Sequence, residues 1–527
     1  MRDYLRRHTN LPVFLFSAIL ALAFVSWGVM APSHLGTIAS DINNWITQVF
    51  GWWYMLCASG FLVLVLILMC SRWGRIRLGP DDSRPEWSTL SWFSMLFTAG
   101  MGIGLVFFGV AEPVFHLNNP PVGEGGTSQA ALKSMEITVF HWGLHPWAIY
   151  IVVGLSLGYF CFRKGLPMRP AAALYPLIGK HIYGPVGHLI DILAVFGTLF
   201  GLATSLGLGA TQINAGLNDV FGMEIGATSQ VIIIGLITAV AVTSVMLGLD
   251  AGIRRLSVLN MYLASLLAVF VFVVGPTIFI LELMVNSTGN YLQHLPENSF
   301  QMYSFSPAGS EWLGNWTLFY WGWWISWSPF VGIFIARVSR GRTIRSFIGG
   351  TLMAPVGASI VWFAIFGGSA LERILSDPDN PLMDAGTNNA MFILLSQLPV
   401  WPVLGTLASL LAILVVSLFF ATSSDSGSLV VDMLTNGGDP HPRKAQRLFW
   451  AVLEGVIAAV LLAAGWTVAG DATAALNPLQ TAAVAMGLPF SLALVLMSWG
   501  LIRGLSQEHA HSPGRRDRYV YPSPPRE

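Results

Sequence analysis

Charged residues are scarce in this chain of 527 residues, and their scarcity indicates its class. Asp, Glu, Lys and Arg make up 10 % of the sequence, whereas about 25 % is usual for a soluble protein. Hydrophobic residues make up 54 %. The 27 basic and 27 acidic residues balance, so the net charge does not indicate a nucleic-acid partner. This composition excludes an ordinary soluble domain and predicts an all-α membrane protein with many spans.

Motifs for catalysis are also missing. The three cysteines, Cys57, Cys70 and Cys161, have no metal-ligand spacing and lie in or beside apolar runs, as small buried hydrophobic residues do. The sequence has no phosphate-binding loop, which argues against a pump driven by ATP. It also has no recognisable nucleophile–base pair and no cofactor motif. We therefore expect neither an enzyme nor a bound organic cofactor.

What the sequence does contain is a series of apolar runs, each long enough to cross a bilayer. They predict twelve transmembrane helices, at residues 13–32, 51–71, 90–110, 138–161, 187–218, 228–248, 257–282, 317–336, 347–367, 400–434, 448–466 and 484–502. The loops between them alternate in charge: one set contains only Lys133 and Arg373, and the other set and the termini hold the remaining basic residues. Because basic loops stay in the cytoplasm, both termini are predicted to be cytoplasmic, in a multi-pass protein of the bacterial inner membrane.

The eighth run contains four tryptophans within seven residues: Trp321, Trp323, Trp324 and Trp327. On a helix Trp323 and Trp327 share a face, with Trp324 about 100° and Trp321 about 160° round from Trp323. Indole faces attract cations that have given up water, above all quaternary ammonium groups. The alternative is an aromatic belt at the membrane interface, which takes about one or two Trp per helix end. The excess of Trp favours a cation-binding role.

The third run has glycine at three alternating positions, Gly100, Gly102 and Gly104. Glycine is a poor helix former, and an unwound membrane helix must turn its free backbone groups toward protein or a water-filled cavity. Such N–H groups bind anionic substrate groups, and such carbonyls bind Na⁺. The alternative is close helix packing through Gly100 and Gly104, which leaves Gly102 unexplained. The pattern therefore favours an unwound binding segment.

The fourth run places Trp142, Trp147 and Tyr150 around Pro146. Trp147 and Tyr150 share a helical face. We expect Pro146 to break the helix, so that Trp142 can join the other two. Ordinary aromatic packing explains this run equally well.

The same run holds His141 and His145, whose i, i+4 spacing is also that of metal ligands. No carboxylate or Cys lies beside them in the sequence. Packing or loop hydrogen bonds are therefore expected rather than a metal, and a proton-carrying role stays open.

Hydroxyl groups gather within two of the apolar runs. The tenth run contains a Thr-Ser-Ser-Asp-Ser sequence that starts at Thr422, and polar groups inside an apolar span indicate function. Thr422 and Ser423 offer neutral oxygens that suit Na⁺, and Asp425 would serve the ion or cap a turn. The fifth run adds Thr198, Thr204 and Ser205. Ser and Thr also join membrane helices by hydrogen bonds, so this second set has two interpretations.

Together these stretches resemble the betaine/choline/carnitine transporter family. The run Trp-Gly-Trp-Trp-Ile-Ser-Trp-Ser-Pro-Phe at 321–330, followed by Arg-Val-Ser-Arg-Gly-Arg-Thr-Ile-Arg at 337–345, is close to the family signature. The glycine, Trp-Tyr and Thr-Ser-Ser-Asp-Ser stretches also match. The resemblance implies a leucine-transporter-like fold of two inverted five-helix repeats, runs 3–7 and 8–12, preceded by two extra helices. It also implies a homotrimer that works by alternating access.

The implied organisation has five segments. The outer segment from Glu282 to Asn315 is too polar to span, and its end, from Ser310, is expected as an interfacial helix. The segments are 1–85 (cytoplasmic amino terminus and first two spans), 86–285 (first repeat), 286–316 (outer loop), 317–504 (second repeat) and 505–527 (short cytoplasmic tail).

The resemblance further implies a substrate site of two parts, an aromatic box for a trimethylammonium group and an unwound backbone for a carboxylate. The box residues are Trp142, Trp147, Tyr150 and Trp324. Those along the pathway beside it are Trp323 and Trp327. The backbone residues are Gly100, Met101, Gly102 and Gly104.

The coupling ions are assigned in the same way. The resemblance implies one Na⁺ between the third and tenth runs, held by Thr98, Met101, Phe419, Thr422 and Ser423. It implies a second Na⁺ near the fifth and eighth runs, at Thr198 and the region of Phe330.

These parts suit a zwitterion, whose cation prefers π faces and whose anion prefers N–H groups. We expect a symporter in the lipid bilayer that imports a zwitterionic compatible solute, glycine betaine foremost, with Na⁺ as the coupling ion. The alternatives are a choline, carnitine, ectoine or dimethylsulfoniopropionate carrier, coupling to protons, and a receptor that binds the solute without moving it.

Gly104 bears on the choice between betaine and choline. In the resembling family, choline carriers tend to have Asp at this position and betaine-type carriers keep Gly. An Asp offsets the net charge of choline but repels the carboxylate of betaine. Gly104 therefore favours a zwitterionic substrate.

Overall fold

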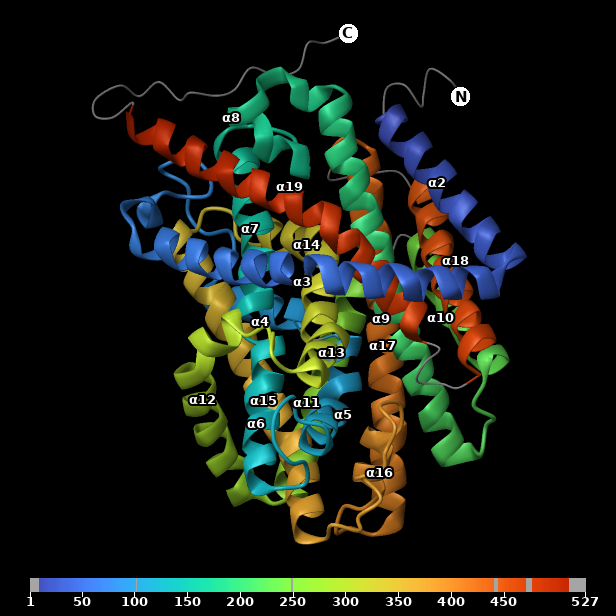
Figure 1. Cartoon of the computed structure of the whole chain (residues 1–527). Helices are drawn as coiled ribbons and strands as arrows, with labels where there is room; N and C mark the ends of the chain where they lie inside the picture. Colours follow the sequence, from blue (N-terminus) through green and yellow to red (C-terminus); the bar gives the residue numbers. More distant parts are fainter. Residues whose placement is uncertain (1–8, 101, 248–249, 440–443, 471–475, 511–527) are drawn as a thin grey trace.

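The computed structural model describes residues 9–510 apart from residues 101, 248–249, 440–443 and 471–475. Over this part the chain is helical, and its β pairing is limited to an isolated bridge between Arg77 and Thr343 (Figure 1). The α-helices are α2 (Leu11–Met30), α3 (Pro32–Cys70), α4 (Thr89–Gly100), α5 (Ile103–Asn118), α6 (Ser128–Trp142), α7 (Leu144–Leu157), α8 (Tyr175–Ile178), α9 (Pro185–Phe221), α10 (Ala227–Leu247), α11 (Asp250–Val274), α12 (Thr277–Phe300), α13 (Pro307–Asn315), α14 (Thr317–Arg337), α15 (Ile344–Ser376), α16 (Ala390–Ser396), α17 (Pro402–Thr435), α18 (Lys444–Ala469) and α19 (Asn477–Ala510). The short segments are the 3-10 turns η1 (Arg72–Arg75), η3 (Pro170–Leu174) and η4 (Gly179–Tyr183) and the π turn η2 (Gly158–Arg163).

Ten helical stretches of the described chain are long and apolar enough to cross a membrane. They are α2, α3, α6 with α7 and η2, α9, α10, α11, α15, α17, α18 and α19. The two other expected spans are an interrupted one, α4 with α5, and α14, in which Trp, Tyr, Ser and Gly replace many aliphatic residues. The chain is therefore a multi-pass membrane protein, and the division of its helices into two inverted repeats stays a prediction.

The polar outer segment is more helical than the sequence suggested. The apolar run expected at 257–282 is divided by Gly275 and Pro276, which separate α11 from α12, because proline has no N–H to continue a helix. α12 then continues through the segment boundary expected at residue 285. α13 occupies the place of the expected interfacial helix, and Ser306 caps it by accepting from the Gly309 N–H at 3.1 Å.

The fourth expected span breaks before Pro146 and not at it. α6 ends at Trp142 and α7 begins at Leu144, so the break lies at Gly143. A Cβ on Gly143 would lie 2.4 Å from the carbonyl oxygen of Val139, so only glycine fits. Pro146 lies in the first turn of α7, where its missing N–H costs no helical hydrogen bond. The expectation that Pro146 breaks the helix was wrong.

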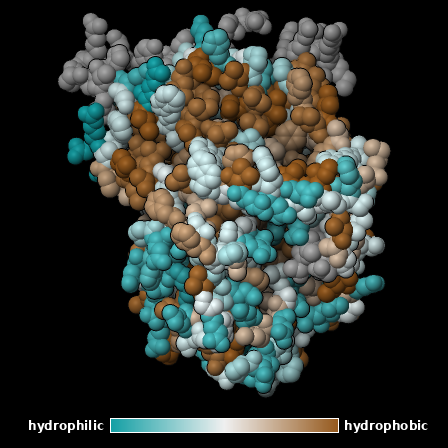
Figure 2. Space-filling view, in the orientation of Figure 1, coloured by the Kyte–Doolittle hydropathy of each residue, from teal (hydrophilic) through white to brown (hydrophobic). Residues whose placement is uncertain are grey.

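The helices differ in how much of their surface is covered. In their most apolar stretches, 89 % of residues are buried in α6–α7 and 83 % in α9, against 28 % in α10 and 22 % in α11. α14 is buried without interruption from Thr317 to Ser326. Figure 2 shows apolar residues gathered over the upper part of one face, as expected of a surface that meets lipid. The centre of the molecule is therefore formed by α6, α7, α9 and α14.

The basic loops that were expected on one side of the membrane contact each other. The bridge between Arg77 and Thr343 joins two of them. Arg163, in a third, donates to Gly79 O at 2.8 Å and pairs with Glu508 near the end of α19. The start of α2 and the end of α19 lie at this end of the molecule (Figure 1). The assignment of this side to the cytoplasm stays a prediction.

Tyr291 of α12 supports the break at Gly143, and its removal should destabilise the fold. Its buried hydroxyl accepts from the Leu144 N–H at 3.0 Å. Tyr291→Phe leaves this N–H unpaired, which costs about 1–3 kcal/mol. We expect the melting temperature of the detergent-solubilised protein to fall by a few degrees. Tyr262→Phe, the same change at a side chain that is 66 % exposed, should leave it unchanged. Equal shifts in the two variants would contradict this role.

Candidate functional site

A row of nearly parallel rings runs along α14. The rings of Trp323 and Trp324 stack with centroids 4.6 Å and planes 16° apart. Trp327 continues the row, 6.3 Å and 20° from Trp323. Trp321 points the other way and packs on Phe140 at 5.2 Å, as its angular offset predicted. Each stacked pair stabilises the fold by about 0.5–1.5 kcal/mol beyond the burial of its area, so the row contributes to the stability of the core.

α6 and α7 place three more rings against this row. Trp142, the last residue of α6, meets Trp324 edge to face at 4.9 Å. Tyr150 of α7 lies 6.3 Å from Trp324 and 6.4 Å from Trp327, and Trp147 lies 5.4 Å from Tyr150. The aromatic residues named from the sequence thus form one group, called the aromatic cluster below: Trp142, Trp147, Tyr150, Trp323, Trp324 and Trp327. All are at most 7 % exposed except Trp327, which is partly buried.

The rings of the aromatic cluster contact each other directly. A cation held between two ring faces would keep their centroids farther apart than the 4.9 Å between Trp142 and Trp324. A surface cavity of about 410 Å³ lies elsewhere, lined by Phe93, Ser94, Met261, Met353 and Ala354. The structure therefore leaves no room for a cation between Trp142 and Trp324, and a ligand at that place must separate these two rings.

Further aromatic side chains pack on the cluster and were missed in the sequence. The Tyr320 ring stacks on Trp324 at 5.5 Å, and Phe108 of α5 lies 5.5 Å from Tyr320. Phe363 of α15 lies 5.6 Å from Trp142. The signal for Tyr320 was its position one helical turn before Trp324. Phe108 and Phe363 come from other helices, and no spacing in the sequence connects them to the cluster.

The third expected span is interrupted where its glycines lie. α4 and α5 are separate helices, and Gly102 at the start of α5 is extended, with φ −147° and ψ −175°. A Cβ on Gly104 would lie 2.7 Å from Trp323 and 2.8 Å from Trp142, so the first turn of α5 touches the aromatic cluster. The first N–H groups of a helix have no partner inside it and attract anions. Met101 lies outside the described residues.

Two buried polar atoms of the aromatic cluster lack a hydrogen-bond partner among the described residues. They are Tyr150 Oη and Trp327 Nε1. The indole of Trp324, by contrast, donates to His141 O at 3.0 Å. A buried polar group without a partner costs about 1–3 kcal/mol. These two atoms are therefore available to bond a ligand or a water.

Thr198 of α9 is a second place where a polar group lacks a partner. It is fully buried, and the part of the chain that the structure describes offers its hydroxyl no hydrogen bond. It lies where α9 and α14 come closest: the adjacent Gly197 O accepts from Ser326 Oγ at 2.9 Å. Phe330, on the same helix as Ser326, stacks on Trp327 at 5.5 Å. Thr198 thus presents a neutral oxygen of the type that suits Na⁺.

The hydroxyls expected at the other ion site lie on α17. Thr422 donates to Leu418 O at 2.8 Å within its own helix, and its oxygen keeps a lone pair for an ion. Ser423 is partly buried and Phe419 is 5 % exposed. The residues expected to face them from α4 lie outside the described residues: the Thr98 side chain and Met101. The structure therefore describes one half of this site.

Other polar candidates of these spans have structural partners. Thr204 donates to the carbonyl of Leu479 at 2.8 Å, and Ser205 to the carbonyl of Gly201 at 3.3 Å. Asp425 pairs with Arg447 of α18. The bond of Thr204 and the ion pair of Asp425 join separate helices, so these two residues contribute to the fold. The Ser205 bond lies within α9.

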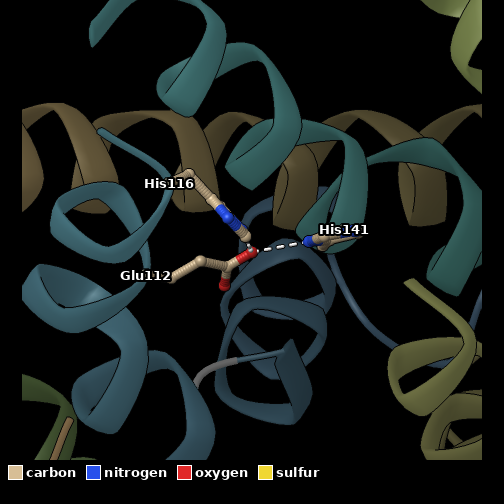
Figure 3. A group of neighbouring side chains, drawn as sticks. All are labelled: Glu112, His116 and His141. Carbon is tan, nitrogen blue, oxygen red and sulfur yellow. Dashed lines mark hydrogen bonds and ion pairs between the residues drawn. The ribbon is translucent and has the colours of Figure 1, made fainter. Parts of the chain in front are cut away.

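A buried carboxylate, Glu112 of α5, contacts the aromatic cluster through Trp142, and Figure 3 shows it beside His116 and His141. Its Oε1 lies 2.6 Å from His141 Nδ1 and 3.3 Å from His116 Nε2. Its Oε2 accepts from Trp142 Nε1 at 2.8 Å and from Tyr320 Oη at 2.5 Å. No carboxylate lies beside His141 in the sequence, but the fold brings Glu112 to it from another helix. The available signal was an acid just beyond an apolar run.

This group has the ligand types of a divalent metal site. The ligand atoms of Glu112, His116 and His141 all lie within 4.8 Å of one another. Two ligands of one ion, each at about 2.1 Å and at right angles, would be about 3 Å apart, whereas 2.6 Å is a direct hydrogen bond. His145 does not join them, since its Nε2 lies 3.1 Å from Ser299 Oγ. The two histidines of α6 and α7 thus have separate hydrogen-bonding roles.

Comparison with known proteins gives matches along nearly the whole chain. Residues 12–510 match the model of the betaine/carnitine/choline family transporter. The chain is 46 % identical over 496 residues to the glycine betaine transporter of Acinetobacter baylyi, covering 94 % of this chain and 73 % of the relative. It is 44 % identical over 503 residues to the glycine betaine transporter OpuD of Bacillus subtilis, covering 95 % of each. It is also 39 % identical over 505 residues to the osmo-dependent choline transporter BetT2 of A. baylyi, covering 95 % of this chain and 72 % of the relative.

Trp324 is the ring that most members of the aromatic cluster contact, so its replacement tests the cluster as a cation site. Trp324→Leu keeps apolar bulk and removes the π face. A desolvated cation–π contact contributes about 2 kcal/mol, so the affinity for glycine betaine should fall about tenfold or more. Calorimetric titration of the folded protein measures this. Trp324→Phe keeps a ring face but removes the hydrogen bond to His141 O, and its affinity for glycine betaine should fall less. Trp401→Leu, at an 81 % exposed position, should leave the affinity unchanged. Unchanged binding in Trp324→Leu would remove this ring from the site.

Proposed function

The chain belongs to the betaine/carnitine/choline transporter family, and on this premise we propose that it imports a zwitterionic quaternary ammonium solute, glycine betaine foremost, by Na⁺-coupled symport. The observation that carries the proposal is the contact between the aromatic cluster and the first turn of α5, where Gly104 lies against Trp323 and Trp142. A ligand at this junction reaches π faces for its cation and free N–H groups for its anion. The chain is thus a transporter and not an enzyme.

Transport requires the aromatic cluster to open and close. Its rings touch in this structure, so the solute enters only when α14 moves relative to α6 and α7. Alternating access provides such a movement, with the site open to each side in turn. The unpartnered Tyr150 Oη and Trp327 Nε1 support a ligand or water between these helices in another state.

We further propose that the transporter works as a homotrimer in a bacterial inner membrane with both termini in the cytoplasm. The matched relatives named above are bacterial proteins. The basic loops contact each other on one side of the molecule, which supports their common assignment to the cytoplasm. The trimer rests on the family resemblance.

A choline carrier is the second candidate, because one relative is named for choline. Choline is a cation without a carboxylate, so it would use the π faces and leave the N–H groups of α5 unpaired. No acidic side chain is present at Gly104 to offset its net charge. This favours the zwitterion over choline.

The coupling of uptake to Na⁺ is tested by removing hydroxyl groups from the two expected ion sites. Uptake into proteoliposomes should vanish without Na⁺. Thr198→Val removes a hydroxyl that has no protein partner in the described structure, and Ser423→Ala removes one on α17. Both should raise the Na⁺ concentration for half-maximal uptake several-fold, while Thr467→Val, at an exposed position on α18, should not. Full uptake driven by a pH gradient alone would overturn Na⁺ coupling.

Two substitutions at Gly104 test whether betaine or choline is the substrate. They separate the effect of side-chain size from that of side-chain charge. The unmutated protein should take up glycine betaine and transport choline poorly. Because any side chain at Gly104 presses on Trp323 and Trp142, Gly104→Ala should weaken uptake of both solutes. Gly104→Asp adds a charge that repels the betaine carboxylate and offsets the charge of choline, so the choline-to-betaine ratio should rise only in this variant. Competitive uptake of the labelled solutes measures the ratio. High-affinity choline uptake by the unmutated protein, with betaine not competing, would refute the assignment.

A further inference from the structure

Glu112 places a carboxylate in the centre of the molecule, and among the described residues no Lys or Arg forms an ion pair with it. It is fully buried. Among the described residues, the groups at ion-pair distance from it are His116 and His141. A charge buried in a medium of low dielectric constant is costly unless hydrogen bonds stabilise it. The hydrogen bonds of Glu112 therefore determine whether it is ionised.

The hydrogen bonds of Glu112 can stabilise an ionised carboxylate. The indole N–H of Trp142 is a donor only, and it and the Tyr320 hydroxyl donate to Oε2. The ring nitrogens His141 Nδ1 and His116 Nε2 lie at hydrogen-bond distance from Oε1. We assign the proton of His141 to Nδ1, with the Thr317 hydroxyl donating to Nε2 at 2.9 Å.

The two donors to Oε2 are aromatic side chains that border Trp324. Trp142 contacts Trp324 edge to face at 4.9 Å, and Tyr320 stacks on it at 5.5 Å. Glu112 therefore fixes the position of both rings. A carboxylate at the N–H edge of an indole also increases the negative charge on the indole face, and the ring then attracts a cation more strongly.

We propose that Glu112 is a positioning residue that gives the aromatic cluster its preference for a positively charged head group, acting through Trp142. The carboxylate stays behind the rings and does not touch the solute. This inference rests on the proposed function, because its ligand is a quaternary ammonium compound.

The test compares two ligands of one shape and different charge. Glycine betaine and 3,3-dimethylbutanoate differ in one atom, since a carbon replaces the ammonium nitrogen. Calorimetric titration of the purified full-length protein gives the ratio of their affinities, or a lower limit on it where the isostere binds weakly. Glu112→Gln keeps the shape and removes the charge, and should lower the affinity for betaine about tenfold while that for the isostere changes less than about twofold. A purely structural role would lower both affinities equally, and an unchanged ratio would overturn the proposal.

Two further variants control for the chemical change. Glu136→Gln makes the same substitution at a glutamate that is 1 % exposed and bonded to Lys133 and Asn298, away from the aromatic cluster, and should leave the ratio unchanged. Glu112→Asp keeps the charge and should restore part of the preference. If the unmutated protein does not bind betaine, the proposed function fails. If it binds betaine and Glu112→Gln does not change the ratio, only the present inference fails.

A double-mutant cycle tests the path through Trp142, using betaine affinity alone. In the Trp142→Phe protein, which lacks the indole N–H, Glu112→Gln should have an effect of less than about twofold. An undiminished effect would show that the carboxylate does not act through Trp142. If Glu112→Gln does not fold, Trp142→Phe is compared with Trp323→Phe, whose N–H bonds a backbone carbonyl at Gly201. A larger loss of betaine affinity in Trp142→Phe supports the proposal, and an equal loss overturns it.

Discussion

A backbone that leaves the helix inside a bilayer needs partners for its N–H and C=O groups, and this requirement organises the centre of the molecule. The interruption between α4 and α5 faces protein: a Cβ on Gly102 would be 3.9 Å from the Trp327 ring, and one on Gly104 would press on Trp323. The helices that cover it, α9 and α14, are buried on nearly all sides. α10 and α11 stand outside this centre, and most residues of their apolar stretches are not buried. The interruption between α4 and α5 and the aromatic cluster are thus in direct contact and are covered by the same helices.

The aromatic cluster is stabilised by an interior without water, whereas the Glu112 carboxylate is destabilised by one. Each ring pair contributes about 0.5–1.5 kcal/mol beyond the burial of its area, and this stabilisation needs a dry interior. A buried carboxylate in the same interior costs several kcal/mol. Hydrogen bonds to an ionised Glu112, at about 1.5–3 kcal/mol each, are of the size needed to offset that cost. A stable charge beside apolar rings is therefore feasible here, and its sign suits a cationic ligand.

Local spacing predicted the directions of side chains well where a single helix was involved. Trp323, Trp324 and Trp327 lie together and Trp321 lies apart, as a period of 3.6 residues requires. The position of a break was harder to predict. Pro146 was expected to interrupt the fourth span, but Gly143 does so, because the chain passes too close to Val139 for any side chain. The extension of α12 beyond the expected apolar run has a similar origin, since a helix in contact with α6 and α15 continues in spite of its polar residues.

The sequence by itself determined the membrane class, the twelve apolar runs and the directions of the rings along each helix, because hydrophobicity and helical period are local properties. The meeting of Trp142, Trp147 and Tyr150 with Trp324 was implied by the family resemblance. The sequence did not determine that Glu112 binds Trp142, that His145 lies apart from His141, or that Thr198 lacks a partner while Thr204 has one. Those outcomes depend on which side chains of separate helices meet. Residues 112 and 142 have no regular spacing that relates them, and only the packing of α5 against α6 brings a carboxylate to the edge of an indole.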